Sequence, residues 1–504
     1  MEGSGTAMTD TAAYDDLTDH LARMGALEQV AGVLNWDQET QMPPKGAAQR
    51  AAQAGAVASA LHALAIDPRI EGWIAAIEAD GPPSGAIAVN VAEARRLHGR
   101  AVRIPSKLAG ELARVSAEVQ MVWEAARPGS DLAAFLPALE RLVALKRSEA
   151  DCLAEPGEAP YDALLAEYEP GITAAEIEVV FGRLRAGLVD LRARIAAKGA
   201  PPARLSGSFP GAGQMALARR LGCVFGYDWA AGRLDLAAHP SSSGSGGDVR
   251  ITTRIDTEDP RECLYSTVHE VGHAVYEQNL DPDQVFLPAG SHASMGIHES
   301  QSRLFENQLG RSRAFCTWLH PAMAEAFGDP GAADPEALYR AVNAVETGLI
   351  RTEADEVHYN LHIMMRFDLE RALISGALAV RDLPEAWNAR FRADFGIEVP
   401  DAARGCMQDV HWAAGLFGYF PTYTLGNIYA GELHAALRRD LPDLDASLAA
   451  GDLAPVLGWL REKIHRRGRL LGPVELVTSA VGHAPTEAPL LAYLEEKYGA
   501  LHGV

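Results

Sequence analysis

Residues 259–275 read DPRECLYSTVHEVGHAV, and this stretch decides the fold of the centre of the chain. Its apolar residues recur at spacings of three and four, which predicts a helix with one buried face: Leu264, Val268, Val271 and Val275. Asp259 suits the N-cap and Pro260 the first helical position, and Glu262 would complete a capping box. The stretch is therefore predicted to be a helix with a well-defined N-terminus.

The same helix carries an HExxH motif, formed by His269, Glu270 and His273. Positions i and i+4 share one face of a helix, so both imidazoles can converge on a single metal ion. Glu270 then lies beside the ion, where it can accept a proton from a water molecule. Gly272 costs about 1 kcal/mol of helix propensity relative to alanine, which indicates that another element packs closely there.

A catalytic zinc site needs a third protein ligand and an open position for water. The metzincin pattern would require Gly and His where this chain has Tyr276 and Asn279, so it is excluded. A glutamate from a following helix is the other common solution. Glu299 lies 26 residues after His273, far enough for a turn and a return, and Glu306 is the weaker alternative. We predict a metal site formed by His269, His273 and Glu299.

A second histidine pair, His358 and His362, also has the i, i+4 spacing but lacks the central glutamate. An apolar run with Met364 and Met365 follows it. We interpret this pair as helix packing.

Helical patterns dominate the rest of the chain and predict a mostly α fold. Expected helices span residues 15–34, 47–65, 86–100, 108–126, 131–149 and 174–198. Residues 233–236 and 248–255 resemble strands of one small sheet, and the Ser/Gly run 241–247 between them is interpreted as a solvated connector. No linker divides the chain, so we expect one catalytic domain over 1–504, with residues 1–8 as a flexible leader.

Composition narrows the functional classes. The 504 residues carry a formal charge of −22, which repels phosphate backbones and argues against nucleic-acid binding. The five cysteines form no CxxC pair, and the N-terminus has no signal-peptide pattern, so we expect a cytoplasmic protein. Residues 412–431 are uncharged, but a proline, an asparagine and four glycines favour a folded segment over a membrane span.

With the metal motif assigned, the chain resembles the carboxypeptidase Taq family of zinc metallocarboxypeptidases over nearly its whole length. The matching motifs come in the family's order: Asn35-Trp36-Asp37, Asp248-Val249-Arg250-Ile251-Thr252, His298-Glu299-Ser300-Gln301, the run from Ile350-Arg351 to Asp355, and the run from Gly405 to Gln408-Asp409-Val410-His411-Trp412. One motif departs: the family's HPF is His239-Pro240-Ser241 here. The missing aromatic residue affects how this loop covers the cleft.

The resemblance implies a saddle-shaped helical fold with a deep central groove, the small sheet near the active site, and commonly a homodimer. It also implies removal of C-terminal residues from peptides with broad specificity and poor action at proline. One zinc ion per chain is expected, with cobalt able to substitute.

The expected mechanism assigns Glu270 as general base. Tyr423 and His411 are candidates for stabilising the oxyanion. The substrate's terminal carboxylate needs a guanidinium partner, for which the resemblance favours Arg351, with Arg250 in reserve. His239 belongs to the substrate-binding loop.

Several points remain open from sequence. Asp355 or Asp409 could orient the ligating histidines, and a carboxylate-seeking enzyme is expected to have a groove less acidic than its exterior. The alternative functions are an oligoendopeptidase of similar helical fold and a catalytically inactive binding scaffold. The intact HExxH motif and Glu299 argue against the scaffold.

Overall fold

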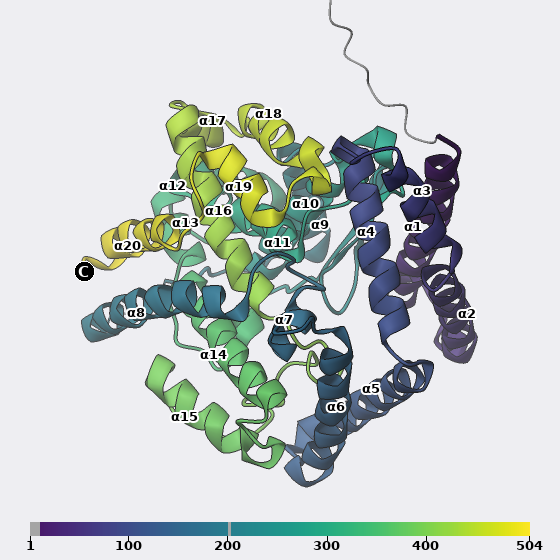
Figure 1. Cartoon of the computed structure of the whole chain (residues 1–504). Helices are drawn as coiled ribbons and strands as arrows, with labels where there is room; N and C mark the ends of the chain where they lie inside the picture. The colour runs from purple at the N-terminus through teal and green to yellow at the C-terminus, as the bar shows by residue number, and fades with distance from the viewer. Residues whose placement is uncertain (1–10, 200–202) are drawn as a thin grey trace, which may run out of the picture.

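The computed structural model describes residues 11–199 and 203–504, which form twenty α-helices and a three-stranded sheet (Figure 1). The expected leader, residues 1–8, lies outside the described residues. The helices before the sheet are α1 (Thr11–Thr40), α2 (Ala47–Ala65), α3 (Arg69–Ala79), α4 (Gly85–Arg103), α5 (Ser106–Ala126), α6 (Leu132–Leu153), α7 (Pro160–Leu165), α8 (Ala174–Lys198) and α9 (Gly211–Val224). The mostly α prediction is confirmed.

The helices after the sheet complete the molecule. They are α10 (Arg261–Gln278), α11 (Met295–Arg303), α12 (Arg313–Phe327), α13 (Pro335–Val342), α14 (Glu356–Ser375), α15 (Leu383–Phe395), α16 (Pro421–Asp440), α17 (Leu444–Ala450), α18 (Ala454–Lys463), α19 (Pro473–Val481) and α20 (Ala488–His502). A short π-helix, Leu304–Leu309, follows α11 without a break. Within the described ranges, no helix is both long and apolar enough to span a membrane.

The sheet has the order β1-β3-β2. Strand β1 (Gly232–Leu236) runs parallel to β3 (Asp248–Thr253), and β2 (Ser242–Ser245) runs antiparallel to β3. The interpretation of residues 241–247 as a connector is therefore wrong. Backbone hydrogen bonds to β3 hold this Ser/Gly segment as a strand. Serine and glycine form no alternating apolar pattern, so the sequence gives no sign of the pairing.

Helix α10 forms as expected but starts slightly differently. It begins at Arg261, and Asp259 accepts the backbone N–H of Arg261 at 3.0 Å. Glu262 accepts a hydrogen bond from Arg254 at 2.9 Å and makes no capping box. The predicted capping box is wrong because the N-cap is Pro260, which has no side-chain acceptor, and Glu262 therefore lies at the second helical position instead of the third.

Two hydrophobic cores hold the molecule together. The larger one runs through the body, and a smaller one joins α1, α3 and α4, the purple to blue helices on one side of Figure 1. Trp36 at the end of α1 ties the two parts together, because its ring lies against the guanidinium groups of Arg233 (4.8 Å) and Arg250 (4.3 Å). These arginines are paired in register on β1 and β3.

At the centre of the molecule, α11 packs between α10 and α16 (Figure 1). A Cβ atom at Gly272 of α10 would lie 2.6 Å from the backbone oxygen of Gln301, and one at Gly426 of α16 would lie 2.6 Å from Cβ of Glu299. Both neighbours therefore need glycine where they touch α11. The expectation of close packing at Gly272 is confirmed.

Candidate metal centre

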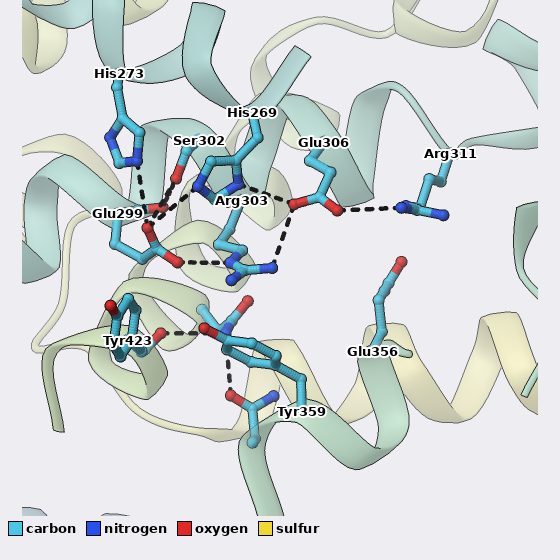
Figure 2. Close-up of polar contacts among 12 residues, drawn as sticks. His269, His273, Glu299, Ser302, Arg303, Glu306, Arg311, Glu356, Tyr359 and Tyr423 are labelled. Carbon is cyan, nitrogen blue, oxygen red and sulfur yellow. Dashed lines mark hydrogen bonds and ion pairs between the residues drawn. The ribbon is translucent and has the colours of Figure 1, made fainter. Parts of the chain in front are cut away.

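Helices α10 and α11 bring three potential metal ligands together. His269 and His273 lie one turn apart on α10, and their Nε2 atoms are 3.6 and 3.4 Å from Oε2 of Glu299 (Figure 2). Ligand atoms bonded at about 2.0–2.2 Å to a tetrahedral ion are roughly 3.3–3.6 Å apart. Both histidine–carboxylate distances are in this range, and the three ligand atoms lie within 4.8 Å of one another, close enough to bind one ion.

Glu299 is held so that one oxygen faces the imidazoles. Its Oε1 accepts a hydrogen bond from Nε of Arg303 at 2.6 Å, and Oε2 accepts one from the hydroxyl of Ser302 at 3.1 Å. Burial raises the pKa of Glu299, but the Arg303 guanidinium and His269 hold it well below its usual range. The carboxylate is therefore ionised, as a ligand must be.

Glu306 lies at the other nitrogen of the His269 ring. Its Oε2 accepts from Nδ1 of His269 at 2.9 Å and from Arg303 at 3.2 Å, and its Oε1 accepts from Arg311 at 3.1 Å (Figure 2). The π-helix after α11 carries it, and such segments often occur at functional sites. In this position Glu306 orients His269.

The two aspartates considered for that role lie elsewhere. Asp409 accepts from Arg351 at 2.9 Å and from Arg366 at 2.7 Å. Asp355 caps the first turn of α14 and pairs with His358 at 2.9 Å. Neither makes a hydrogen bond to His269 or His273 among the contacts of the described residues.

A cavity of about 1030 Å³ opens beside His269 and is lined by this residue, Glu270 and Arg351 among others, whereas His273 and Glu299 do not line it. Burial raises the pKa of Glu270 to about 7. Nine acidic side chains and six arginines line the cavity, a ratio close to the 67 acidic against 45 basic residues of the whole chain. The cavity as a whole is therefore about as acidic as the chain, and the expectation of a groove less acidic than the exterior stays a prediction.

Positive charge is instead concentrated at Arg351. Its guanidinium donates to Asp409 through Nε at 2.9 Å and to the hydroxyl of Tyr359 through Nη1 at 3.3 Å. Arg366 shares the same aspartate, so two cations face one anion. Arg351 is only 7% exposed, and this small surface opens into the cavity.

His411 and Tyr423 form a pair near Arg351. Nε2 of His411 and the Tyr423 hydroxyl lie 3.1 Å apart, and the Arg351 guanidinium carbon lies 5.2 Å from the centre of the Tyr423 ring. Burial, and then the charge of Arg351, lowers the pKa of His411 to about 3. The pair therefore consists of a neutral imidazole and a neutral phenol.

Arg250 and His239 are not brought into this group. Arg250 pairs with Asp248 at 2.8 Å and covers Trp36, and it does not line the cavity. The His239 side chain is exposed, although the next residue, Pro240, lines the cavity. The geometry thus favours Arg351 over Arg250 as a receptor for a carboxylate.

Two further histidine groups need separate interpretation. His358 bonds Asp355, and His362 packs on Phe395 with ring centres 4.5 Å apart, as expected for helix packing. Glu277, His292 and His298 also lie within reach of one ion. Their donor–acceptor distances of 2.9 and 3.1 Å, however, are those of hydrogen bonds and shorter than the spacing in the first group.

Comparison with known proteins identifies the family of the chain. Residues 16–498 match the family model of the carboxypeptidase Taq (M32) metallopeptidases. The chain belongs to this family. It is 44% identical to thermostable carboxypeptidase 1 of Thermus thermophilus, across 98% of this chain and 100% of that protein, and 35% identical to carboxypeptidase 1 of Bacillus subtilis, across 96% and 97%.

Solved structures of carboxypeptidases have the same fold. The M32 carboxypeptidase of Deinococcus radiodurans superposes with a TM-score of 0.94 at 39% identity, covering 98% of this chain and 100% of that one. Trypanosoma cruzi metallocarboxypeptidase 1 gives 0.94 at 34% identity, covering 97% and 100%. The protein is thus a metallocarboxypeptidase. Neither alternative function, an oligoendopeptidase or an inactive binding scaffold, is favoured.

Sequence reasoning missed two side chains that contact the candidate site, Arg303 and Tyr359. Arg303 lies four residues after Glu299 on one helix face, a spacing that could have indicated the pair. Tyr359 lies under the Arg303 guanidinium at 4.1 Å and also contacts Arg351. No sequence signal links it to α11, because α14 meets this region only through the tertiary fold.

Proposed function

We propose that this metallocarboxypeptidase releases C-terminal amino acids at one zinc ion held by His269, His273 and Glu299, with Glu270 as general base. The observation that carries the proposal is that the proposed base and the carboxylate receptor Arg351 line one cavity. His and carboxylate ligands in this number are those of catalytic zinc sites. The donor set also accommodates cobalt.

The metal ion, when bound, would activate a water molecule and polarise the scissile carbonyl. Glu270 accepts a proton from that water and delivers it to the leaving amine. A carboxyl whose pKa lies near 7 is well matched to both transfers at neutral pH. The Tyr423 hydroxyl, paired with His411, donates a hydrogen bond to the oxygen on which negative charge develops.

Arg351 binds the free carboxylate of the substrate. Asp409 fixes its plane through Nε and Nη2, and the Tyr359 hydroxyl accepts from Nη1, so the remaining N–H of each outer nitrogen is the donor proposed for a second anion. Arg366 shares Asp409, so that the aspartate does not neutralise both cations. An endopeptidase has no need for a receptor of this kind in its cleft. His239 and the loop around it then contact the substrate at the rim.

The finer attributes follow from the family resemblance. We propose broad side-chain specificity with poor action at proline, a homodimer, a cytoplasmic location and one catalytic domain over 1–504. The family match across 16–498 supports the single domain. We expect no nucleic-acid or membrane partner.

Mass spectrometry of a peptide digest tests the exopeptidase activity. The expected products are ladders that shorten from the C-terminus one residue at a time. Internal fragments that carry new C-termini from the start of the reaction would contradict the proposal and support an oligoendopeptidase.

A further inference from the structure

The two histidines of the proposed metal site differ in the hydrogen bonding of Nδ1, the ring nitrogen that faces away from the other proposed ligands. Nδ1 of His269 donates to Glu306, whereas Nδ1 of His273 is buried and has no hydrogen-bond partner in the described part of the chain. A ligating histidine usually donates this N–H to an acceptor, which fixes the orientation of its ring. Another contact must therefore orient His273.

The ring of His298 makes that contact. It stacks on the ring of His273 with centres 4.5 Å apart and planes inclined by 23°. His298 directly precedes Glu299 on α11, so the helix that supplies the carboxylate ligand also supplies the stacking ring. A ring stacked in this way limits the rotation of His273 about its χ2 angle without any hydrogen bond.

Glu277 in turn holds His298. Nε2 of His298 donates to Oε1 of Glu277 at 3.1 Å, and Nδ1 of His292 donates to the same oxygen at 2.9 Å. Glu277 lies one turn after His273 on α10 and is 6% exposed. The stacking ring is thus fixed to the helix that carries the histidine it supports.

We propose that His298, held by Glu277, is the positioning residue for His273. It fixes the orientation of the His273 ring by stacking, as Glu306 fixes that of His269 by a hydrogen bond. The proposal rests on the proposed metal site. His292 provides a matched control, since it bonds the same oxygen of Glu277 but meets His298 edge-on at 4.9 Å and makes no ring contact with His273 that the structure records.

The test measures metal affinity of the full chain. Metal-free protein is titrated with zinc against a competing chelator, and the visible spectrum of the cobalt-loaded protein reports the ligand geometry. His298→Ala should raise the zinc Kd about 10- to 100-fold and alter the cobalt spectrum. His298→Phe keeps a stacking ring but loses the bond to Glu277, so it should recover part of the affinity, whereas His292→Ala should stay within about twofold of wild type.

The outcomes separate the possibilities. Wild-type affinity in His298→Ala would overturn the proposal, and so would a His298→Phe variant as weak as His298→Ala. A second zinc equivalent that disappears in His292→Ala would also overturn it, because Glu277, His292 and His298 would then be ligands. If His298→Ala does not fold, the melting temperature of the metal-free protein reveals this, and the phenylalanine variant decides.

Failure of the underlying metal site looks different. Wild-type protein that binds no zinc, or Glu299→Ala protein that binds it as tightly as wild type, would contradict the proposed function itself. Tight binding in wild type, lost in Glu299→Ala and unchanged in His298→Ala, would contradict only the positioning role.

Discussion

Oε2 of Glu306 lies 2.9 Å from Nδ1 of His269, while Oε2 of Glu299 lies 3.6 Å from Nε2 of the same ring (Figure 2). One imidazole is thus placed between two carboxylates, and Arg303 contacts both of them at 2.6 and 3.2 Å. A carboxylate at the outer nitrogen orients the ring and increases its basicity as a ligand. The two glutamates therefore face opposite nitrogens of one ring, and we expect mutation to separate their effects on zinc binding.

Glu306→Gln should keep an acceptor for His269 but lose the negative charge, and Glu306→Ala should lose both. We expect zinc affinity to fall in that order, by up to about 100-fold for alanine. Glu299→Ala should bind zinc more weakly than either. Chelator competition measures all three, and a stronger loss in Glu306→Ala than in Glu299→Ala would exchange the two assignments.

Glu270→Gln should retain zinc but lose activity, because this side chain is assigned to proton transfer and not to the metal. Removing a general base costs about 10²- to 10⁴-fold in rate. Elemental analysis gives the metal content, and turnover of a blocked dipeptide gives the rate. Near-normal turnover in the metal-loaded variant would show that another group is the base.

Amidating the C-terminus of a peptide should slow its cleavage strongly, since the Arg351 guanidinium then faces a neutral group. Losing a partly buried, charge-assisted pair costs about 2–5 kcal/mol, or roughly 30-fold to several thousand-fold in kcat/KM. Arg351→Ala should slow only the free acid and so remove most of the discrimination. Arg250→Ala, outside the cavity, should preserve it, and the reverse result would transfer the role to Arg250.

Gly272→Ala should weaken the metal site although alanine favours a helix. The new Cβ would meet the backbone of Gln301 and Ser302 at 2.6 Å and displace the helix that carries Glu299. A Cβ atom added at Gly182, within α8, would meet nothing within 4 Å, so Gly182→Ala should be neutral or stabilise by up to about 1 kcal/mol. Zinc Kd and melting temperature of both variants test the contrast, and equal effects would reject it.

Stability should fall as pH rises through 7, owing partly to the buried Glu370. Burial raises its pKa to about 7 from 4.5, despite hydrogen bonds from Tyr161, Trp412 and Gly418. The folded state binds more protons than the unfolded state between these values, so the stabilisation is complete below about pH 4.5 and is lost on passing pH 7. Glu169, with its pKa also raised to about 7 by burial, adds to the same slope.

Glu370→Gln cannot ionise, so its melting temperature should decline less between pH 5 and 8 than that of wild type. The difference corresponds to about 1–3 kcal/mol. Glu140→Gln, on the exposed face of α6, is the control and should follow the wild-type curve. Parallel curves for wild type and Glu370→Gln would mean that Glu370 does not titrate in this range.

Regular helices could be predicted closely because their signals are local. The ranges 47–65 and 174–198 agree with α2 and α8, and Gly199 ends the latter in a left-handed conformation at φ 61°. Strand β2 could not be predicted, because Ser and Gly have no strand preference of their own and pair only where β3 offers its edge. Helix α10 starts at Arg261, one residue later than predicted, with Pro260 in place of Asp259 as the N-cap.

The sequence by itself determined that His269 and His273 share a face with Glu270 between them, since that geometry lies within one helix. Only the tertiary structure decided which carboxylate faces which nitrogen of His269. Glu299 and Glu306 lie on α11 and on the π-helix that follows it, and both reach His269 because α11 packs against α10 at Gly272. It likewise separated Arg351, which opens into the cavity, from Arg250, which packs on Trp36. Contacts between distant segments depend on how whole elements pack, and no local pattern encodes them.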